Sequence, residues 1–327
     1  MIKSWLNKNV FVTGCTGLLG SWLAEELISL GVNVIGLERD HVPQSRLYRE
    51  ALTDKITVVY GNLEDYHIVE RTLNEYEVEI VFHIAAQTIV PIANKNPLST
   101  FESNIKGTWI LLEACRRNER VKKIIVASSD KAYGEQKILP YTEEMPLMGR
   151  NPYDVSKSCA DLIAQMYFYH YELPICVTRC GNLFGGGDLN FNRIVPGTIR
   201  SVFYNERPVI RSDGSYTRDY FYVKDAVKAY ILLAEKMDDS GIVGQVFNFG
   251  NDTPMTVLEM AKEILSLTDC LDLEPIILNQ AKGEIPKQYL SSKKAREMLQ
   301  WKPTHSVREG LLETIEWYKN YLTHIKR

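Results

Sequence analysis

Two side chains in the middle of the chain have the types and the spacing of a proton-transfer pair. Tyr153 and Lys157 stand four residues apart in NPYDVSK, directly after Pro152, where a helix is expected to begin. Residues four apart project from the same face of a helix. A nearby ammonium lowers the pKa of a phenol, which lets Tyr153 take a hydroxyl proton while hydride leaves the same carbon. The pair therefore indicates an alcohol oxidation, although most isolated YxxxK matches are ordinary helix surface.

A glycine loop near the N-terminus supplies a second chemical signal. Gly14, Gly17 and Gly20 follow the apolar run 9–13 and precede helical periodicity over residues 21–30. Glycines at a strand-to-helix turn let backbone N–H groups and a helix N-terminus approach a pyrophosphate. The position of the loop within the first βαβ unit predicts a dinucleotide site; glycines that only make a turn are the alternative.

An acidic residue stands where the ribose of such a dinucleotide would lie. Glu38 ends the second apolar run, about 20 residues beyond the loop, and can accept hydrogen bonds from the adenosine ribose hydroxyls. This favours NAD. Arg39 follows directly and could receive a 2′-phosphate, so NADP is the less favoured alternative. A solvated cluster of charges at a strand end is the third interpretation.

These residues need a sheet to position them, and the first half of the chain predicts one. Short β-branched runs alternate with stretches of helical periodicity. The runs cover residues 9–13, 33–37, 57–60, 80–84, 123–128 and 175–179. Alternation of this kind is typical of a parallel sheet, and continuous apolar runs require helices on both faces. We expect an α/β fold, a doubly wound parallel sheet of Rossmann type, over residues 1–184.

The pattern changes after residue 184. Loops rich in Gly, Asn and Pro separate isolated helical segments. These segments are expected at residues 194–204, 223–235, 257–266, 291–299 and 307–322. We expect residues 185–327 to form a smaller C-terminal substrate-binding lobe, with one strand at 245–248 that returns to the sheet. The crevice between the two parts is the expected ligand site.

The composition limits the possible partners. The chain has 327 residues with 45% apolar and 24% charged residues, values typical of folded soluble proteins, and a net charge of −3. A basic excess for nucleic-acid binding is missing, and the six scattered cysteines and six histidines show no disulfide or metal-ligand spacing. The N-terminus lacks a signal-peptide pattern, and the apolar runs are too short for a bilayer. We expect a cytoplasmic protein without nucleic-acid, membrane or metal partners.

Taken together, the motifs resemble the extended short-chain dehydrogenase/reductases, the NAD-dependent epimerase/dehydratase family that modifies nucleotide sugars. The resemblance covers nearly the whole chain. The matching segments are GCTGLLG, HIAAQ (83–87), NIKGT (104–108), SSDKAYG (128–134), NPYDVSK, RCGNLFGGGD (179–188) and RDYFYVKDA (218–226). One departure is Asn62 before Leu63, where the family often has aspartate; asparagine can still contact adenine.

The resemblance implies a set of ligand contacts. Those to the cofactor, NAD, come from Gly14, Thr16, Gly17, Leu18, Leu19, Gly20, Glu38, Arg39, Asn62, Leu63, Ala85, Ala86, Gln87, Asn104, Tyr153 and Lys157. Those to the nucleotide sugar come from Gln87, Ser129, Asn182, Arg193 and Arg218. Within this set Ser129 steadies the reacting hydroxyl, Arg218 reaches the diphosphate, and Arg193 is a second phosphate candidate.

Asp130 and Lys131 distinguish between the reactions that this family performs. Oxidation at the sugar C4 is common to all of them, but a 4,6-dehydratase must also take a proton from C5 and give one to the departing C6 hydroxyl. An adjacent acid and amine can supply both transfers. The SDK triplet resembles CDP-glucose 4,6-dehydratases, although some UDP-N-acetylglucosamine dehydratases share it. We therefore expect five catalytic residues: Ser129, Asp130, Lys131, Tyr153 and Lys157.

Other interpretations remain open at this point. A UDP-hexose 4-epimerase would share the fold and the hydride chemistry, and Asp130 with Lys131 would then be a solvated surface ion pair. A non-catalytic dinucleotide-binding sensor or scaffold is the alternative of another class, and the intact Tyr153 and Lys157 argue against it. Helices expected at 98–118 and 153–171 could pair with their symmetry mates, which predicts a homodimer.

Overall fold

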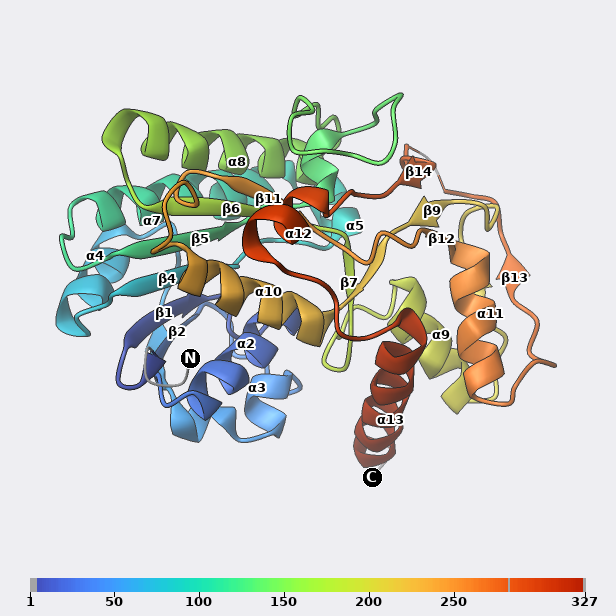
Figure 1. Cartoon of the computed structure of the whole chain (residues 1–327). Coiled ribbons are helices and arrows are strands. Elements are labelled where there is room, and N and C mark those ends of the chain that lie inside the picture. The colour runs from blue at the N-terminus through green and yellow to red at the C-terminus, as the bar shows by residue number, and fades with distance from the viewer. Residues whose placement is uncertain (1–4, 282, 326–327) are drawn as a thin grey trace.

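A seven-stranded parallel sheet forms the centre of the computed structural model, which describes residues 5–281 and 283–325 (Figure 1). Its strands are β1 (Asn9–Thr13), β2 (Asn33–Glu38), β3 (Thr57–Tyr60), β4 (Ile80–His83), β5 (Lys123–Ala127), β6 (Ile175–Cys180) and β11 (Val246–Phe249). They lie in the order β11-β6-β5-β4-β1-β2-β3, and every neighbouring pair is parallel. The expected α/β class is confirmed, including the late strand that returns to the sheet.

Helices cover both faces of this sheet, as Figure 1 shows. One face is covered by α4 (Tyr66–Glu75), α7 (Gly107–Arg116) and α8 (Pro152–Tyr171), and the other by α2 (Leu18–Ser29) and α10 (Val223–Lys236). Along β1, Val10 and Val12 pack into the core that contains α2 and α10, whereas Phe11 packs into the core that contains α4, α7 and α8. The strand is apolar throughout because both of its sides are covered.

The strand order reverses at β1, and this reversal indicates where a ligand is expected to bind. The chain runs from β1 outward through β2 to β3, and then returns to the other side of β1 with β4. In open α/β sheets ligands bind beyond the carboxyl ends of the strands at such a switch point. The glycine loop after β1 and the segment after β4 both begin there.

Shorter elements connect these layers. They are α3 (Arg46–Arg49), η1 (Leu52–Lys55), α5 (Val90–Lys95), α6 (Pro97–Phe101), η2 (Glu102–Lys106), η3 (Asp130–Tyr133), β7 (Asn182–Phe184), β10 (Tyr220–Tyr222) and α12 (Lys293–Leu299). The helix expected at 98–118 is therefore divided, because η2 is a π-helical turn between α6 and α7.

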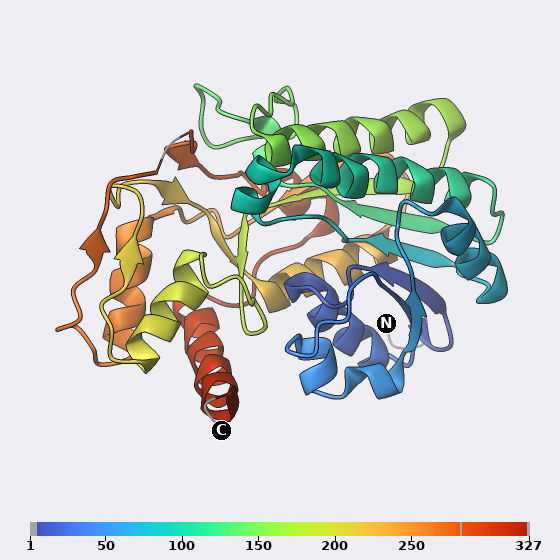
Figure 2. The same cartoon turned by 180° about the vertical axis from the view of Figure 1, so that it is seen from behind.

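The remaining elements gather beside the sheet as a smaller lobe, seen from behind in Figure 2. They are α9 (Ile194–Phe203), β8 (Val209–Ile210), β9 (Thr217–Arg218), β12 (Met255–Thr256), α11 (Val257–Leu267), β13 (Ile276–Ile277), β14 (Lys287–Gln288) and α13 (Val307–Ile325). β12, β9 and β14 form a three-stranded sheet, and β13 pairs with β8. The division of the chain at residue 184 stays a prediction; α10, which follows it, packs on α2 and β5.

All six cysteines are free. Across residues 5–281 and 283–325, no helix has both the length and the apolar composition that crossing a membrane requires. In the same part of the chain, no three His, Cys, Asp or Glu side chains gather in a way that could hold a metal ion.

Candidate active site

The glycine loop is built for close approach of backbone. Gly14 has φ +75°, and a Cβ there would lie 2.8 Å from Cα of Ala85. A Cβ on Gly20 would lie 2.1 Å from the Gly14 carbonyl oxygen. Gly17 caps α2 without any side-chain hydrogen bond, and the first turn of α2 contains no acidic residue. The N–H groups of this turn and the helix dipole therefore suit the pyrophosphate of a dinucleotide.

Glu38, at the end of β2, has one carboxylate oxygen that makes no hydrogen bond, Oε1, which faces His41. The residue is only 1% exposed. Its Oε2 accepts a hydrogen bond from the Tyr48 hydroxyl, while its buried Oε1 has no hydrogen-bond partner, and His41 Nδ1 lies 3.4 Å away. A buried carboxylate oxygen in this state fits the hydroxyls of a ribose, because burial without a partner is unfavourable. Arg39 instead bonds to Asp40 Oδ2 (2.7 Å) and Ser103 Oγ (3.2 Å).

A depression beside Glu38 brings together two of the predicted cofactor residues. Its lining consists of Arg39, Asn62, Glu64, Asp65, Tyr66, Ser99, Glu102 and Ser103. Leu63 and Leu19 belong to the two cores rather than to this surface. Leu63 packs so closely on Gly107 that a Cβ there would lie 2.8 Å from Leu63 Cδ2. Any contact of these two leucines with a ligand is thus limited to their backbone or side-chain edges.

Asn104 holds the loop that follows β4. Its Oδ1 accepts from the Gln87 N–H (2.7 Å), and its Nδ2 donates to the Gln87 carbonyl (3.2 Å) and to Ser156 Oγ (2.9 Å). Both amide hydrogens are therefore used within the protein. Thr13 Oγ1 fixes the start of the same loop by accepting from the N–H groups of Ile84 and Ala85. Ala86 lies between these anchors, so the loop meets a ligand in a fixed shape.

His83, at the end of β4, has a structural environment. It is buried between the hydroxyls of Thr13 and Thr108, each 2.9 Å from a ring nitrogen. Burial lowers its pKa to about 3, so the ring is neutral at physiological pH.

Ser129, Asp130 and Lys131 form one hydrogen-bonded turn after β5. Ser129 Oγ donates to Asp130 Oδ1 (3.0 Å) and accepts from the Lys131 N–H (3.2 Å). Lys131 Nζ lies 3.3 Å from Asp130 Oδ2. Asp130 is only 2% exposed, and burial lowers the pKa of Lys131. The two charges are therefore not the solvated surface pair considered as an alternative.

Tyr153 and Lys157 open α8 and are both buried. Burial raises the pKa of Tyr153 to about 12, while its hydrogen bond with Ser129 and the charge of Arg193 act in the opposite direction. The expected influence of Lys157 on this phenol is not among the main ones. Lys157 Nζ donates instead to the Ala127 carbonyl (2.7 Å), and burial lowers its pKa to about 8. Both side chains come from the first two turns of α8, as the helical spacing predicted, but the Lys157 ammonium binds a carbonyl of β5.

Two of the predicted substrate residues, Arg193 and Arg218, come from the smaller lobe. Arg193 binds Asp188 Oδ2 (2.9 Å) and Thr88 Oγ1 (3.2 Å), and its charge acts on Tyr153. Arg218 donates to the Thr217 and Pro286 carbonyls, and its charge acts on Lys131. One cation, Arg193, therefore acts on Tyr153, and the other, Arg218, acts on Lys131.

Asn182 begins β7, and its N–H donates to the Asp219 carbonyl (2.8 Å). This bond fixes the backbone of Asn182 beside β10, to which β7 is paired. The role of its side chain toward a substrate stays a prediction.

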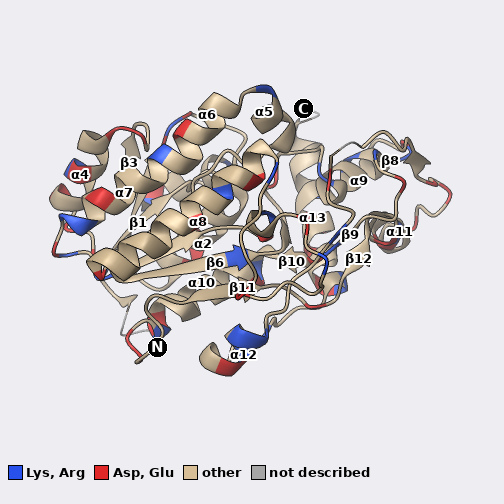
Figure 3. Cartoon of the chain, turned by 90° about the horizontal axis from the view of Figure 1, so that it is seen from above, with Lys and Arg blue, Asp and Glu red and all other residues tan. Residues whose placement is uncertain are grey.

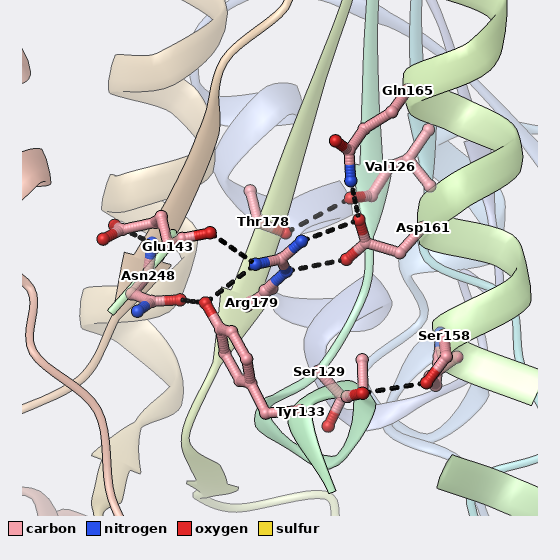
Figure 4. Close-up of polar contacts among 12 residues, drawn as sticks. Val126, Ser129, Tyr133, Glu143, Ser158, Asp161, Gln165, Thr178, Arg179 and Asn248 are labelled. Carbon is pink, nitrogen blue, oxygen red and sulfur yellow. Dashed lines mark hydrogen bonds and ion pairs between the residues drawn. The ribbon is translucent and has the colours of Figure 1, made fainter. Parts of the chain in front are cut away.

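A buried network that the sequence interpretation did not identify supports the catalytic turn (Figure 4). Arg179 of β6 forms two bonds to Asp161 of α8, at 2.8 and 3.0 Å, and its Nη1 donates to the Tyr133 hydroxyl (2.9 Å) of η3. Tyr133 in turn donates to Asn248 Oδ1 (2.7 Å) of β11. Three elements, β6, α8 and η3, thus meet at one guanidinium, and β11 joins them through Tyr133.

Gln288 is the second residue that was missed. It lies in β14, in a segment without periodic or motif signal, yet it reaches Lys131 and Asp130. Gln288 is more than 150 residues away from this turn in the sequence, so no local pattern could predict the contact.

Comparison with known proteins identifies the family of the chain. Residues 11–314 match the family model described as GDP-mannose 4,6 dehydratase. The chain belongs to this dehydratase family. The family assignment confirms the resemblance seen in the motifs, which extends over the glycine loop, the catalytic turn and α8.

Relatives of this dehydratase family cover nearly the whole chain. CDP-glucose 4,6-dehydratase of Salmonella typhimurium is 29% identical over 97% of this chain and 92% of its own length. Human dTDP-D-glucose 4,6-dehydratase is 28% identical over 95% of this chain and 90% of its own length. Among solved structures, UDP-glucose 4-epimerase of Thermotoga maritima is 31% identical with a TM-score of 0.87, covering 96% of this chain and 99% of that one.

Breaking the buried pair between Arg179 and Asp161 should destabilise the protein strongly. Arg179→Met leaves the Asp161 carboxylate buried without its partner, so we expect the free energy of unfolding to fall by about 3–5 kcal/mol. The double variant Arg179→Met/Asp161→Leu removes both charges, so its free energy of unfolding should fall by less. Urea denaturation followed by tryptophan fluorescence measures the difference.

Arg117→Met serves as the control, because Arg117 pairs with Glu113 at the surface and such pairs contribute little. Equal urea midpoints for the wild type and Arg179→Met would contradict this account of the network.

Proposed function

We propose that the protein is an NAD-dependent nucleotide-sugar 4,6-dehydratase, similar in chemistry to the CDP-glucose 4,6-dehydratases. It would convert a hexose nucleotide into its 4-keto-6-deoxy derivative and release water. The observation that carries the proposal is the buried Asp130–Lys131 pair beside Ser129 and Tyr153. Membership of the dehydratase family and the NAD named in the structure of a dTDP-glucose 4,6-dehydratase from Bacillus anthracis support it.

The residues of the nucleotide loop suit NAD. The glycine turn would hold the pyrophosphate and Glu38 the adenosine ribose, with Asn62 at the adenine end. When bound, NAD supplies the hydride acceptor for C4 and the hydride that returns to C6. Glu38 is buried and negative in this role, so it disfavours the additional phosphate of NADP.

The remaining steps are proton transfers by side chains of this chain. Tyr153 would take the proton of the C4 hydroxyl as the phenolate, a form that its hydrogen bond with Ser129 and the charge of Arg193 favour and burial disfavours, and Ser129 would orient that hydroxyl. The resulting C4 ketone acidifies C5, and Lys131 would take the C5 proton. Asp130, in its protonated form, would protonate the departing C6 hydroxyl, which leaves as water, and Lys131 would return its proton to C5 as hydride reaches C6. The proton that Tyr153 took from the C4 hydroxyl would then pass through solvent to Asp130, which restores both groups. Burial supports the Lys131 step because it lowers the pKa of this ammonium and increases the neutral fraction.

A second candidate is a UDP-hexose 4-epimerase, favoured by the similarity to the Thermotoga maritima enzyme. An epimerase has no use for proton transfer at C5 and C6. Incubation of the protein with CDP-, UDP-, GDP- and dTDP-hexoses separates the two candidates: a 4-keto-6-deoxy product supports the dehydratase, and an epimer without loss of water overturns it.

Asp130→Asn should separate oxidation from dehydration. We expect reduced nicotinamide to accumulate in a single turnover, seen by its near-ultraviolet absorbance, while the 4-keto-6-deoxy product forms about 10²- to 10⁴-fold more slowly, because a positioned acid has been removed. Tyr153→Phe is the matched comparison and should lose both signals. Product formation by Asp130→Asn at the wild-type rate would exclude the role of Asp130.

Glu38→Ala should weaken NAD binding about tenfold or more, since a charge-assisted hydrogen bond to the ribose is lost. The preference for NAD over NADP should fall as well, because the negative charge is removed. Isothermal titration with each cofactor measures both effects. Asp40→Asn, an exposed neighbour, should bind NAD as the wild type does, and an unchanged affinity in Glu38→Ala would contradict the assignment.

We also propose a homodimer through α7 and α8. Both helices lie on the face seen in Figure 3, and residues 162–171 of α8 contain no Asp, Glu, Lys or Arg. Leu162, Met166 and Tyr169 are 55%, 44% and 74% exposed on successive turns, and Trp109 of α7 is 42% exposed. An apolar stripe of this kind is typical of a helix–helix interface.

Light scattering tests the dimer. Wild-type protein should have twice the mass of the chain, and Leu162→Glu/Met166→Glu should be monomeric with an unchanged fold by circular dichroism, because two charges would be buried at the interface. Leu312→Glu, at an exposed site on α13, is the control and should stay dimeric. A monomeric wild type would reject the proposal.

A further inference from the structure

The side chain of Gln288 crosses from the smaller lobe into the catalytic turn. Gln288 belongs to β14 and is fully buried, at 0% exposure. Its Nε2 donates to the Asp130 carbonyl at 2.8 Å, and its Oε1 accepts from Lys131 Nζ. One amide thus contacts both members of the Asp130–Lys131 pair.

The backbone that carries Gln288 is fixed from two sides. On one side β14 pairs with β9, where Gln288 lies opposite Arg218 and the Thr217 N–H donates to the Pro286 carbonyl at 2.8 Å. On the other side, the Tyr141 N–H donates to the Tyr289 carbonyl at 2.9 Å. The position of the strand therefore does not depend on the Gln288 side chain, which is free to serve the turn.

We propose that Gln288 is a positioning residue that holds Lys131 in place for proton transfer and ties it to the strand that carries Arg218. The inference rests on the proposed function, because it gives Lys131 its partner in the dehydration step. It goes further by assigning a role to the smaller lobe: the strand beside the predicted diphosphate contact also sets the geometry of the proton-transfer pair.

The chemistry of an amide explains why glutamine suits this place. A single planar group donates to the Asp130 carbonyl and accepts from the Lys131 ammonium, so each contact fixes the orientation of the other. Leucine offers neither contact, and glutamate keeps the acceptor but lacks the donor. Because an amide oxygen is neutral, it orients Lys131 without adding a full charge that would hold the proton.

The other charged groups around Lys131 come from each neighbouring element. Asp130 belongs to its own turn, Asp154 to α8 and Arg218 to β9. The two carboxylates favour the ammonium and Arg218 disfavours it, while burial has the largest effect and lowers the pKa of Lys131. Gln288 adds one acceptor to this set, and replacing that acceptor should therefore move the protonation of Lys131 in a defined direction.

Competitive labelling of Lys131 by acetic anhydride, read by peptide mass spectrometry across a pH series, gives the pKa of Lys131 without turnover. Gln288→Leu removes an acceptor from the charged form, so the pKa of Lys131 should fall by about one pH unit. Gln288→Glu adds a negative charge and should raise it. A purely structural role for Gln288 would not produce shifts of opposite sign.

Single-turnover kinetics supply the second measurement. Both variants should oxidise C4 within about twofold of the wild-type rate and dehydrate about tenfold more slowly, with the KM for the sugar nucleotide nearly unchanged, since the loss of one positioned proton-transfer group affects the later step alone. The acid limb of the dehydration rate should move to lower pH in Gln288→Leu and to higher pH in Gln288→Glu, because the neutral amine of Lys131 is the active form.

The matched control is Gln136→Leu. Gln136 Nε2 also donates to this turn, at the Tyr133 carbonyl (2.7 Å), and its second hydrogen bond goes to the Pro146 carbonyl (3.1 Å). This control should leave the pKa of Lys131 unchanged, and circular dichroism establishes folding for all variants. A pKa of Lys131 that is the same in the wild type and both Gln288 variants overturns the proposal. If no sugar nucleotide is dehydrated, the proposed function fails, while labelling still decides whether Gln288 controls Lys131.

Discussion

The buried pair between Arg179 and Asp161 is the constraint on which the rest of the site depends. Burying two charges is favourable only when geometry and remaining hydrogen bonds are satisfied. Here the guanidinium is held by the Asp161 carboxylate, the Tyr133 hydroxyl and the Glu143 carbonyl, so its position is fixed by three groups. Asp161 is one helical turn beyond Lys157 on α8, and Tyr133 ends the turn that begins at Asp130. The Arg179 guanidinium therefore fixes the helix that carries Lys157 and the turn that carries Asp130 relative to each other.

The sheet and the smaller lobe contribute different charged groups to the candidate site. The sheet side supplies the proposed proton-transfer groups, Tyr153, Asp130 and Lys131, while the smaller lobe supplies two cations whose charges act on them, Arg193 and Arg218. Arg193 is held by Asp188 and by Thr88 of the loop after β4, and Arg218 is held by the Pro286 carbonyl of the smaller lobe. The acid–base behaviour of the site is therefore a joint property of both parts, and neither has it alone.

The sequence predicted the parts of the molecule that leave a local pattern. All seven strands were expected because a strand covered on both faces must be apolar along its length, and the Tyr153–Lys157 spacing was informative because a helix repeats in this way. The contacts of Lys157 with Ala127 and of Gln288 with Lys131 had no such signal, since they join segments that are distant in the chain. Leu63 showed the same limit: its motif position indicated a ligand contact, but its side chain packs on Gly107.

The π-helical turn at Glu102–Lys106 limits how the gene can change length. Each residue of a helix turns the chain by about 100°, so the loss of one residue here would rotate everything that follows. In this turn Asn104 faces Gln87 and Ser156, whereas Leu111 and Leu112 of α7 face the core. After a one-residue deletion, either Asn104 could keep its contacts or Leu111 and Leu112 could keep their place in the core, but not both. Insertions and deletions should therefore be rare in this stretch among functional variants, even where single substitutions are tolerated.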